Sequence, residues 1–141
     1  MNESKISPPD QTRIAEQRAV IDRATRARYG TPLRGGTEDL ALLQRLLDDG
    51  VYGVNHTYEL QSLGVGLGQV LADEVSAKLS WVTVTDEWGV DPALRYGTTT
   101  LLVFPLTMIS KRLEEYRLVN VQELYDNTVT TVAQLAREGW E

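Results

Sequence analysis

The segment SWVTVTDEWGVDPALRYGTTTLLVF, residues 80–104, decides the fold class, because it interrupts a chain that is otherwise patterned as helices. Residues 80–85 are rich in β-branched and aromatic side chains, which predicts a strand. Residues 93–96 predict a short second strand after a turn over residues 86–92, and residues 98–104 predict a third. Short connections favour antiparallel pairing. We therefore expect a small three-stranded antiparallel sheet.

A continuous apolar run at residues 101–104 lies within the third predicted strand, and it indicates burial on both faces or a central position in the sheet. Pro105 ends this strand. Residues 106–113 are compatible with a helix or with a continuation of the strand. We favour the helix because its apolar residues recur at spacings of three and four, namely Leu106, Ile109 and Leu113.

Further helices are predicted on both sides of this segment. Three precede it, over about residues 8–29, 37–50 and 57–78, and a last one follows over about residues 120–138. Helices that are segregated from a small antiparallel sheet make an α+β domain. We expect the sheet to pack against the third and last of these helices, with an N-terminal helical part preceding it.

Charge and patterning divide the chain near residue 36. Residues 1–36 carry seven basic and four acidic side chains, whereas residues 37–141 carry seven basic and sixteen acidic ones. The apolar face of the first helix consists mostly of small residues, so we expect residues 1–36 to form a peripheral helix and loop. Residues 37–141 are expected to form a single α+β domain.

Small residues line one edge of the third predicted helix at intervals of four: Gly64, Gly68 and Ala72. A stripe of this kind predicts close packing of another backbone. With Gly66, the two glycines also give the run G-V-G-L-G, which invites comparison with a dinucleotide-binding loop. That loop needs G-x-G-x-x-G after a strand, and here the third glycine is one position early and the preceding residues are patterned as helix. We favour close packing.

The composition excludes several classes of function. Without cysteine there is no disulfide, thiol nucleophile or thiolate metal site, and a single histidine, His56, excludes a multi-histidine metal centre. The net charge of -6 argues against nucleic acid and is compatible with a basic protein partner. No signal-peptide core is visible, and the longest apolar run, residues 101–106, is far short of the ~20 residues of a membrane span. We expect a cytoplasmic protein that does not contact a membrane.

Three carboxylates gather in the predicted turn at Asp86, Glu87 and Asp91. Oxygen ligands suit a weak calcium or magnesium site, but the spacing does not match an EF-hand loop. We favour a solvated turn and expect no metal and no cofactor. Exposed aromatic residues are typical of protein interfaces, and Trp88 in this turn is the strongest candidate, followed by Tyr116 and Trp140.

The segments DEWGVDPALRY (residues 86–96) and LVFPLTMISKR (residues 102–112), with LGVGLG at residues 63–68, resemble a family of small bacterial domains of unknown function. The resemblance covers about residues 57–126. It implies a bacterial origin and the extent of a domain, and it implies no mechanism.

Charged and aromatic side chains of this family-like region are the candidate binding surface. We expect Arg95 to pair with Asp86 across the hairpin and the charged members to cluster at one end of the sheet. The candidates are Asp86, Glu87, Trp88, Asp91, Arg95, Tyr96, Lys111 and Arg112.

These features favour a non-enzymatic module that binds another protein, and its most specific form is an immunity-type inhibitor of a toxin. One alternative is a self-associating structural domain, in which the glycine-striped helix or the N-terminal helix packs across a two-fold axis of a homodimer. Another is an enzyme that uses the carboxylates and Arg95, which would require those carboxylates to converge in a deep cleft.

Overall fold

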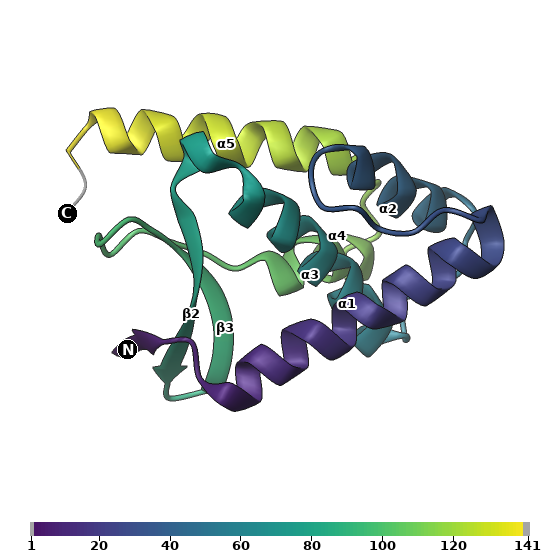
Figure 1. Ribbon diagram of the computed structural model, residues 1–141, viewed down its shortest axis with the longest axis horizontal. Helices are drawn as coiled ribbons and strands as arrows, with labels where there is room; N and C mark the ends of the chain where they lie inside the picture. The colour runs from purple at the N-terminus through teal and green to yellow at the C-terminus, as the bar shows by residue number, and fades with distance from the viewer. Residues whose placement is uncertain (1, 140–141) are drawn as a thin grey trace.

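Strands and helices are segregated in the structure, a computed structural model that describes residues 2–139 (Figure 1). In chain order the elements are β1 (Asn2–Lys5), α1 (Pro8–Tyr29), α2 (Glu38–Asp48), α3 (Thr57–Asp73), the 3-10 helix η1 (Val75–Ala77), β2 (Leu79–Asp86), β3 (Gly89–Tyr96), β4 (Leu102–Val103), the 3-10 helix η2 (Pro105–Thr107), α4 (Met108–Glu114) and α5 (Val121–Arg137). The strands lie at one end of the molecule and α2 at the other, and α3 runs between α1 and α5. The predicted α+β class is confirmed.

The sheet has the strand order β1-β2-β3-β4, and each strand is antiparallel to its neighbour. The β2–β3 hairpin turns over Glu87 and Trp88, because Asp86 faces Gly89. β3 therefore starts earlier than predicted, and Asp91 lies in the strand. The fourth strand, β1, is an addition to the three predicted ones. Its sequence, Asn-Glu-Ser-Lys, lacks an apolar alternation because it forms an exposed edge that buries little.

The N-terminal segment differs from the peripheral helix and loop that we predicted for residues 1–36. β1 pairs with β2, and α1 packs along α3. Ile21 and Gln17 of α1 are fully buried, and the Gln17 side-chain amide donates to the carbonyl oxygen of Tyr58 and to the Ser62 hydroxyl. Part of the buried face of α1 is thus polar. The apolar residues of α1 alone therefore underestimate the area that this helix buries against α3.

Helix α3 is the centre of the core. It contacts α1, α2, α4, α5, β2 and η2, and its residues from Leu60 to Leu71 are almost all buried. It ends at Asp73, before the predicted end at residue 78. A single turn of 3-10 helix and Lys78, whose backbone is left-handed with φ of 53°, then lead into β2.

The glycines of α3 lie where other elements approach its backbone. A Cβ atom added to Gly64 would lie 2.7 Å from the carbonyl oxygen of Leu106 and closer still to that of Pro105, both in η2. At Gly68 it would lie 2.6 Å from the indole ring of Trp81 and 2.7 Å from the Pro105 ring. Ala72 continues this edge and is partly buried against the main core.

The apolar run at residues 101–104 occupies an edge of the sheet, in contrast to the central or doubly buried position that we predicted. β4 has only two residues and pairs with β3 alone, and Phe104 is exposed. Within this run Leu101 is buried in the main core and Val103 packs against that core, whereas Leu102 packs against a small cluster on the other face of the sheet. Residues 105–114 form a 3-10 turn and then a helix, as favoured.

We expect Gly64→Ala to destabilise the protein by about 3 kcal/mol, because the new methyl group meets backbone atoms that cannot move aside. The matched control is Gly66→Ala, whose Cβ would meet only the flexible end of the Leu43 side chain, 3.0 Å away. Both substitutions gain about 1 kcal/mol of helix propensity, so the difference between the two variants reports the clash at Gly64. Urea unfolding of both variants checks the prediction, and equal losses of unfolding free energy would contradict it.

Candidate functional site

A groove runs along the edge of the sheet between β4, α4 and α5. Its volume is about 510 Å³, within the range of ligand-binding clefts. The walls are mainly apolar, and the polar groups come from one face of α5 and from α4. The lining residues are Leu101, Leu102, Val103, Phe104, Met108, Arg112, Leu124, Asn127, Thr128, Thr131, Val132 and Leu135.

The groove follows the free edge of β4. Successive side chains of a strand point to opposite faces of the sheet. Here Val103 packs against the main core, while Leu102 packs against a small cluster on the other face of the sheet. Both residues line the groove, so the cavity lies against the strand edge, where a further strand would extend the sheet.

Among the described residues that line the groove, only Arg112 is charged. One of its guanidinium nitrogens, Nη1, donates to the Met108 carbonyl oxygen one turn earlier, at 2.8 Å. None of the ion pairs found in the described residues includes Arg112. A cation without a carboxylate partner in an acidic protein is a candidate recognition group.

A second groove of about 460 Å³ adjoins the first and shares Arg112, Leu124 and Asn127 with it. Its other lining residues come from the end of α2, from the loop before α5 and from the first turn of α5: Asp48, Leu118, Val119, Asn120 and Glu123. The two grooves meet at the three shared residues, and Asp48 and Glu123 make the second groove acidic.

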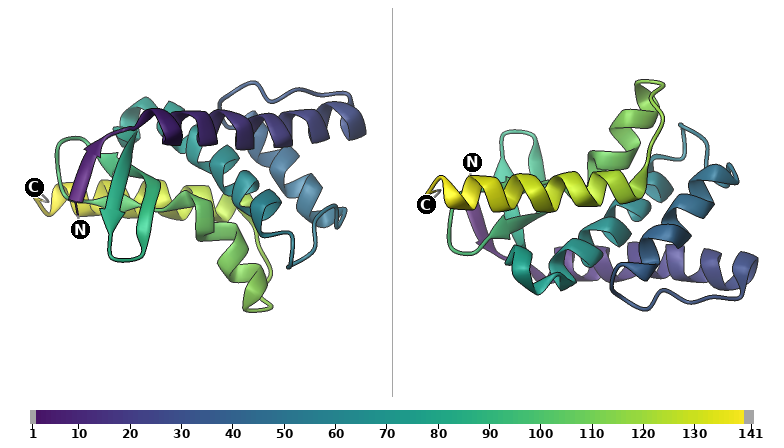
Figure 2. Two further views of the ribbon diagram at one scale, coloured as in Figure 1. Left: turned by 90° about the horizontal axis from the view of Figure 1, so that it is seen from below. Right: turned by 90° about the horizontal axis from the view of Figure 1, so that it is seen from above.

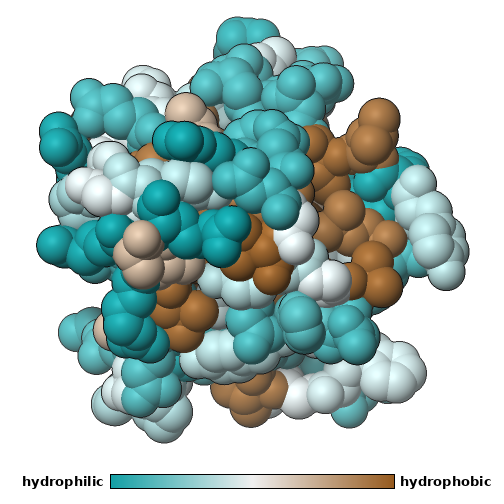
Figure 3. Space-filling model, turned by 90° about the vertical axis from the view of Figure 1, so that its right-hand side faces the viewer, coloured by the Kyte–Doolittle hydropathy of each residue, from teal (hydrophilic) through white to brown (hydrophobic). Residues whose placement is uncertain are grey.

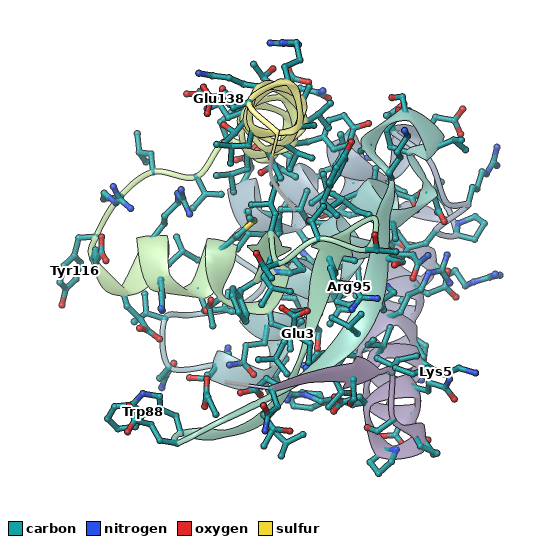
Figure 4. The ribbon with its side chains drawn as sticks, turned by 90° about the vertical axis from the view of Figure 1, so that its left-hand side faces the viewer. Glu3, Lys5, Trp88, Arg95, Tyr116 and Glu138 are labelled. Carbon is teal, nitrogen blue, oxygen red and sulfur yellow. The ribbon has the colours of Figure 1, made fainter. Side chains whose placement is uncertain are left out.

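Two exposed aromatic side chains project from the side of the molecule that carries α4. Figure 2 shows the β2–β3 turn and the end of α4 pointing the same way, and we call this the projecting side. Trp88 at the turn is 87% exposed and Tyr116 after α4 is 94% exposed. In Figure 4 both point outward at the same edge of the molecule. Trp88 is held at the turn by its backbone N–H, which donates to Asp86 at 2.8 Å.

The end of the molecule that lies farthest from the sheet, where α1 ends and α2 lies, has a discontinuous apolar surface. Figure 3 shows brown areas separated there by polar side chains. The largest brown area lies at the right of this view, on the side toward which α4 projects.

Arg95 does not pair with Asp86 as we predicted. The strand register places Arg95 opposite Ser80 and Asp86 at the other end of the hairpin. Arg95 instead pairs with Glu3 of β1 at 3.6 Å, and the two side chains point toward each other over the sheet in Figure 4. This ion pair lies on the same face as the buried Val82, Val84 and Ala93, so it covers that face.

The other predicted site residues are also spread over different elements. Asp91 accepts from the Arg13 guanidinium of α1 at 3.1 Å. Glu87 is exposed in the hairpin turn, Lys111 is exposed on α4, and Tyr96 is partly buried at the end of β3. The predicted cluster at one end of the sheet is therefore not formed, and the carboxylates do not converge in a cleft.

Of the predicted site residues, the structure places Arg112 in the groove and Trp88 on the projecting side. Trp140 lies outside the described residues. The residues missed were those of α5, above all Thr131 and Leu135, and the apolar Phe104. The run at residues 101–104, which is more apolar than an edge strand needs, was a signal for Phe104, whereas no signal pointed to the residues of α5.

Residues 39–125 match the protein family described as a domain of unknown function, DUF3806. The chain belongs to this family. The matched region contains β2 to β4, α4 and the part of α5 that begins the groove, and it starts upstream of the region whose resemblance was visible in the sequence.

A crystal structure from Bacteroides thetaiotaomicron VPI-5482 is similar to this chain, with a TM-score of 0.83 and 18% identity. The similarity covers 92% of this chain and 48% of that one, so this chain spans about half the length of its structural neighbour. The likeness shows the fold. No curated protein matches the chain. None of the helices within residues 2–139 has both the length and the apolar character needed to cross a membrane.

Tyr125 lies on the buried side of α5, and we predict that it makes the stability of the protein depend on pH in the alkaline range. Burial, followed by its hydrogen bond to Glu74, raises its pKa to about 12 from 10.0. The folded state therefore keeps the phenol neutral where the unfolded state ionises it. Stability from this group is present below pH 10 and is lost as the pH rises toward 12. In Tyr125→Phe, urea unfolding should show a smaller loss of stability over this interval, and an unchanged profile would contradict the prediction.

Proposed function

We propose that this domain binds another protein through its projecting side, with Trp88 and Tyr116 as the main contact residues. The observation that carries the proposal is the exposure of two large aromatic side chains on two separate protrusions that point the same way. Trp and Tyr are enriched among residues that dominate binding energy. Val90 beside the turn and Leu118, which is 99% exposed, add apolar surface on the same elements.

The charges around Trp88 favour a basic partner. Asp86 and Glu87 precede Trp88 and make that turn acidic. Near Tyr116, Glu114 and Glu115 are balanced by Lys111 and Arg117, and Arg117 pairs with Glu115 at 3.2 Å. All four carboxylates are exposed. Acidic side chains that flank apolar contact residues accelerate and select the approach of a basic surface.

The net charge disfavours a second copy of this chain as the partner. Two copies would bring together two proteins that each carry a net charge of -6. In its most specific form, the proposal makes the domain an immunity-type inhibitor of a basic toxic enzyme. The acidic turn that carries Trp88 supports this form.

Site-specific photo-cross-linking in the native host tests the proposal. A photo-reactive amino acid replaces Trp88, Tyr116 or, as the control, Val75, which is 87% exposed in η1 away from the aromatic pair. We expect positions 88 and 116 to trap the same heterologous protein, identified by mass spectrometry, and position 75 not to trap it. Covalent homodimers from positions 88 and 116 would overturn the proposal in favour of self-association.

With the trapped partner in hand, Trp88→Ala should weaken binding by about 2 kcal/mol, which is roughly thirtyfold in Kd. The reason is that an exposed indole becomes buried only in the complex, so its loss acts on binding and leaves folding intact. Calorimetry measures Kd, and thermal unfolding should show an unchanged midpoint. A variant that binds as tightly as the parent would exclude Trp88 from the interface.

A further inference from the structure

We infer that the groove between β4, α4 and α5 takes an extended segment of a protein partner, which pairs with β4 as an added strand and places a carboxylate side chain against Arg112. This inference rests on the proposed function and specifies how the partner is bound. The edge geometry, the apolar walls and the charge at Arg112 each contribute one part of the argument.

The backbone of β4 presents hydrogen-bonding groups on its free edge. The Tyr96 N–H donates to the Leu101 carbonyl oxygen at 3.0 Å, and Tyr96 lies opposite Leu101 when the register of β3 and β4 is extended by one residue. Hydrogen-bonded and non-hydrogen-bonded pairs alternate along an antiparallel ladder. The Arg95–Leu102 pair is therefore of the second kind, and the N–H and C=O of Leu102 point away from β3 toward the groove.

The walls of the groove fit the side chains of a strand. Phe104, Met108 and Leu124 give one apolar part, and Val132 and Leu135 of α5 give another. A segment in this position would direct alternate side chains toward the groove walls and toward solvent. A helix would leave the edge of β4 unpaired, so the exposed backbone favours an extended occupant.

The charge in the groove selects one acidic side chain in the segment. Arg112 has no carboxylate partner among residues 2–139 and lies where the two grooves join. Because the second groove adjoins the first at Arg112, the segment has room to extend beyond this residue, and its carboxylate comes from an internal Asp or Glu. Beyond Arg112, Asp48 and Glu123 favour a basic residue next in the segment.

The test selects random eight-residue peptides, displayed on phage, against the full chain. Counter-selection uses Thr131→Arg, which places a long cation inside the groove at an exposed position of α5. Thr130→Arg is the matched control, because Thr130 is exposed on the same helix and outside the groove lining. Circular dichroism should show that both variants are folded like the parent.

We expect enriched peptides to alternate apolar and polar residues and to contain an Asp or Glu. Thr131→Arg should weaken their binding by about tenfold or more and Thr130→Arg should leave it unchanged. Arg112→Gln should weaken a selected peptide by about fivefold, and should not weaken the same peptide carrying Gln in place of its acidic residue. Hydrogen exchange at the Leu102 amide should slow when the peptide binds.

Three results would overturn the inference: no enrichment over the Thr131→Arg counter-selection, enriched peptides with helical spacing of their apolar residues, or unchanged exchange at Leu102. These results leave the proposed function standing if positions 88 and 116 still trap a common partner. Conversely, selected peptides that bind the groove without any trapped partner would support the inference and count against the projecting side as the interface.

Discussion

At Gly64 the backbone of α3 lies against the backbone of η2 with no side chain between them, and the rest of the structure depends on this contact. It fixes where the chain leaves the sheet after β4 and where α4 begins. One turn later the Trp81 ring packs directly against Gly68, so the same helix also positions β2. A side chain at either position would separate the sheet from α3 and change the shape of the groove that β4 and α4 form.

The other wall of the groove, α5, is held by the apolar contacts of Val121, Tyr125 and Val132 and by polar contacts. Helix α5 buries few of its side chains, and it is held at its start by Gln44 of α2. The Gln44 side chain donates to the Val119 carbonyl oxygen at 3.1 Å and accepts from the Val121 N–H at 2.7 Å. Asn120 caps the helix, and Tyr125 donates to Glu74 at the end of α3. These bonds allow the outer face of α5 to remain open beside β4.

Much of the fold was predictable from local patterns, and the site was not. The spacing of apolar residues located α2, α3, α4 and α5. Arg95 shows why the site was missed. Its partner, Glu3, belongs to a strand whose polar sequence gives no periodic signal and which becomes a strand only by pairing with β2. Gln17 likewise is buried through partners on α3 that lie far away in the sequence.

The sequence by itself determined the α+β class, the helix positions and the stripe of small residues at Gly64 and Gly68, because each is a pattern of residues that are near one another in the chain. Only the tertiary structure decided that residues 101–104 lie at the edge of the sheet, beside α5. An apolar run shows that a segment will be covered, whereas its cover depends on strand order and on packing between distant elements. The groove, Arg112 within it and the common direction of Trp88 and Tyr116 all follow from that arrangement.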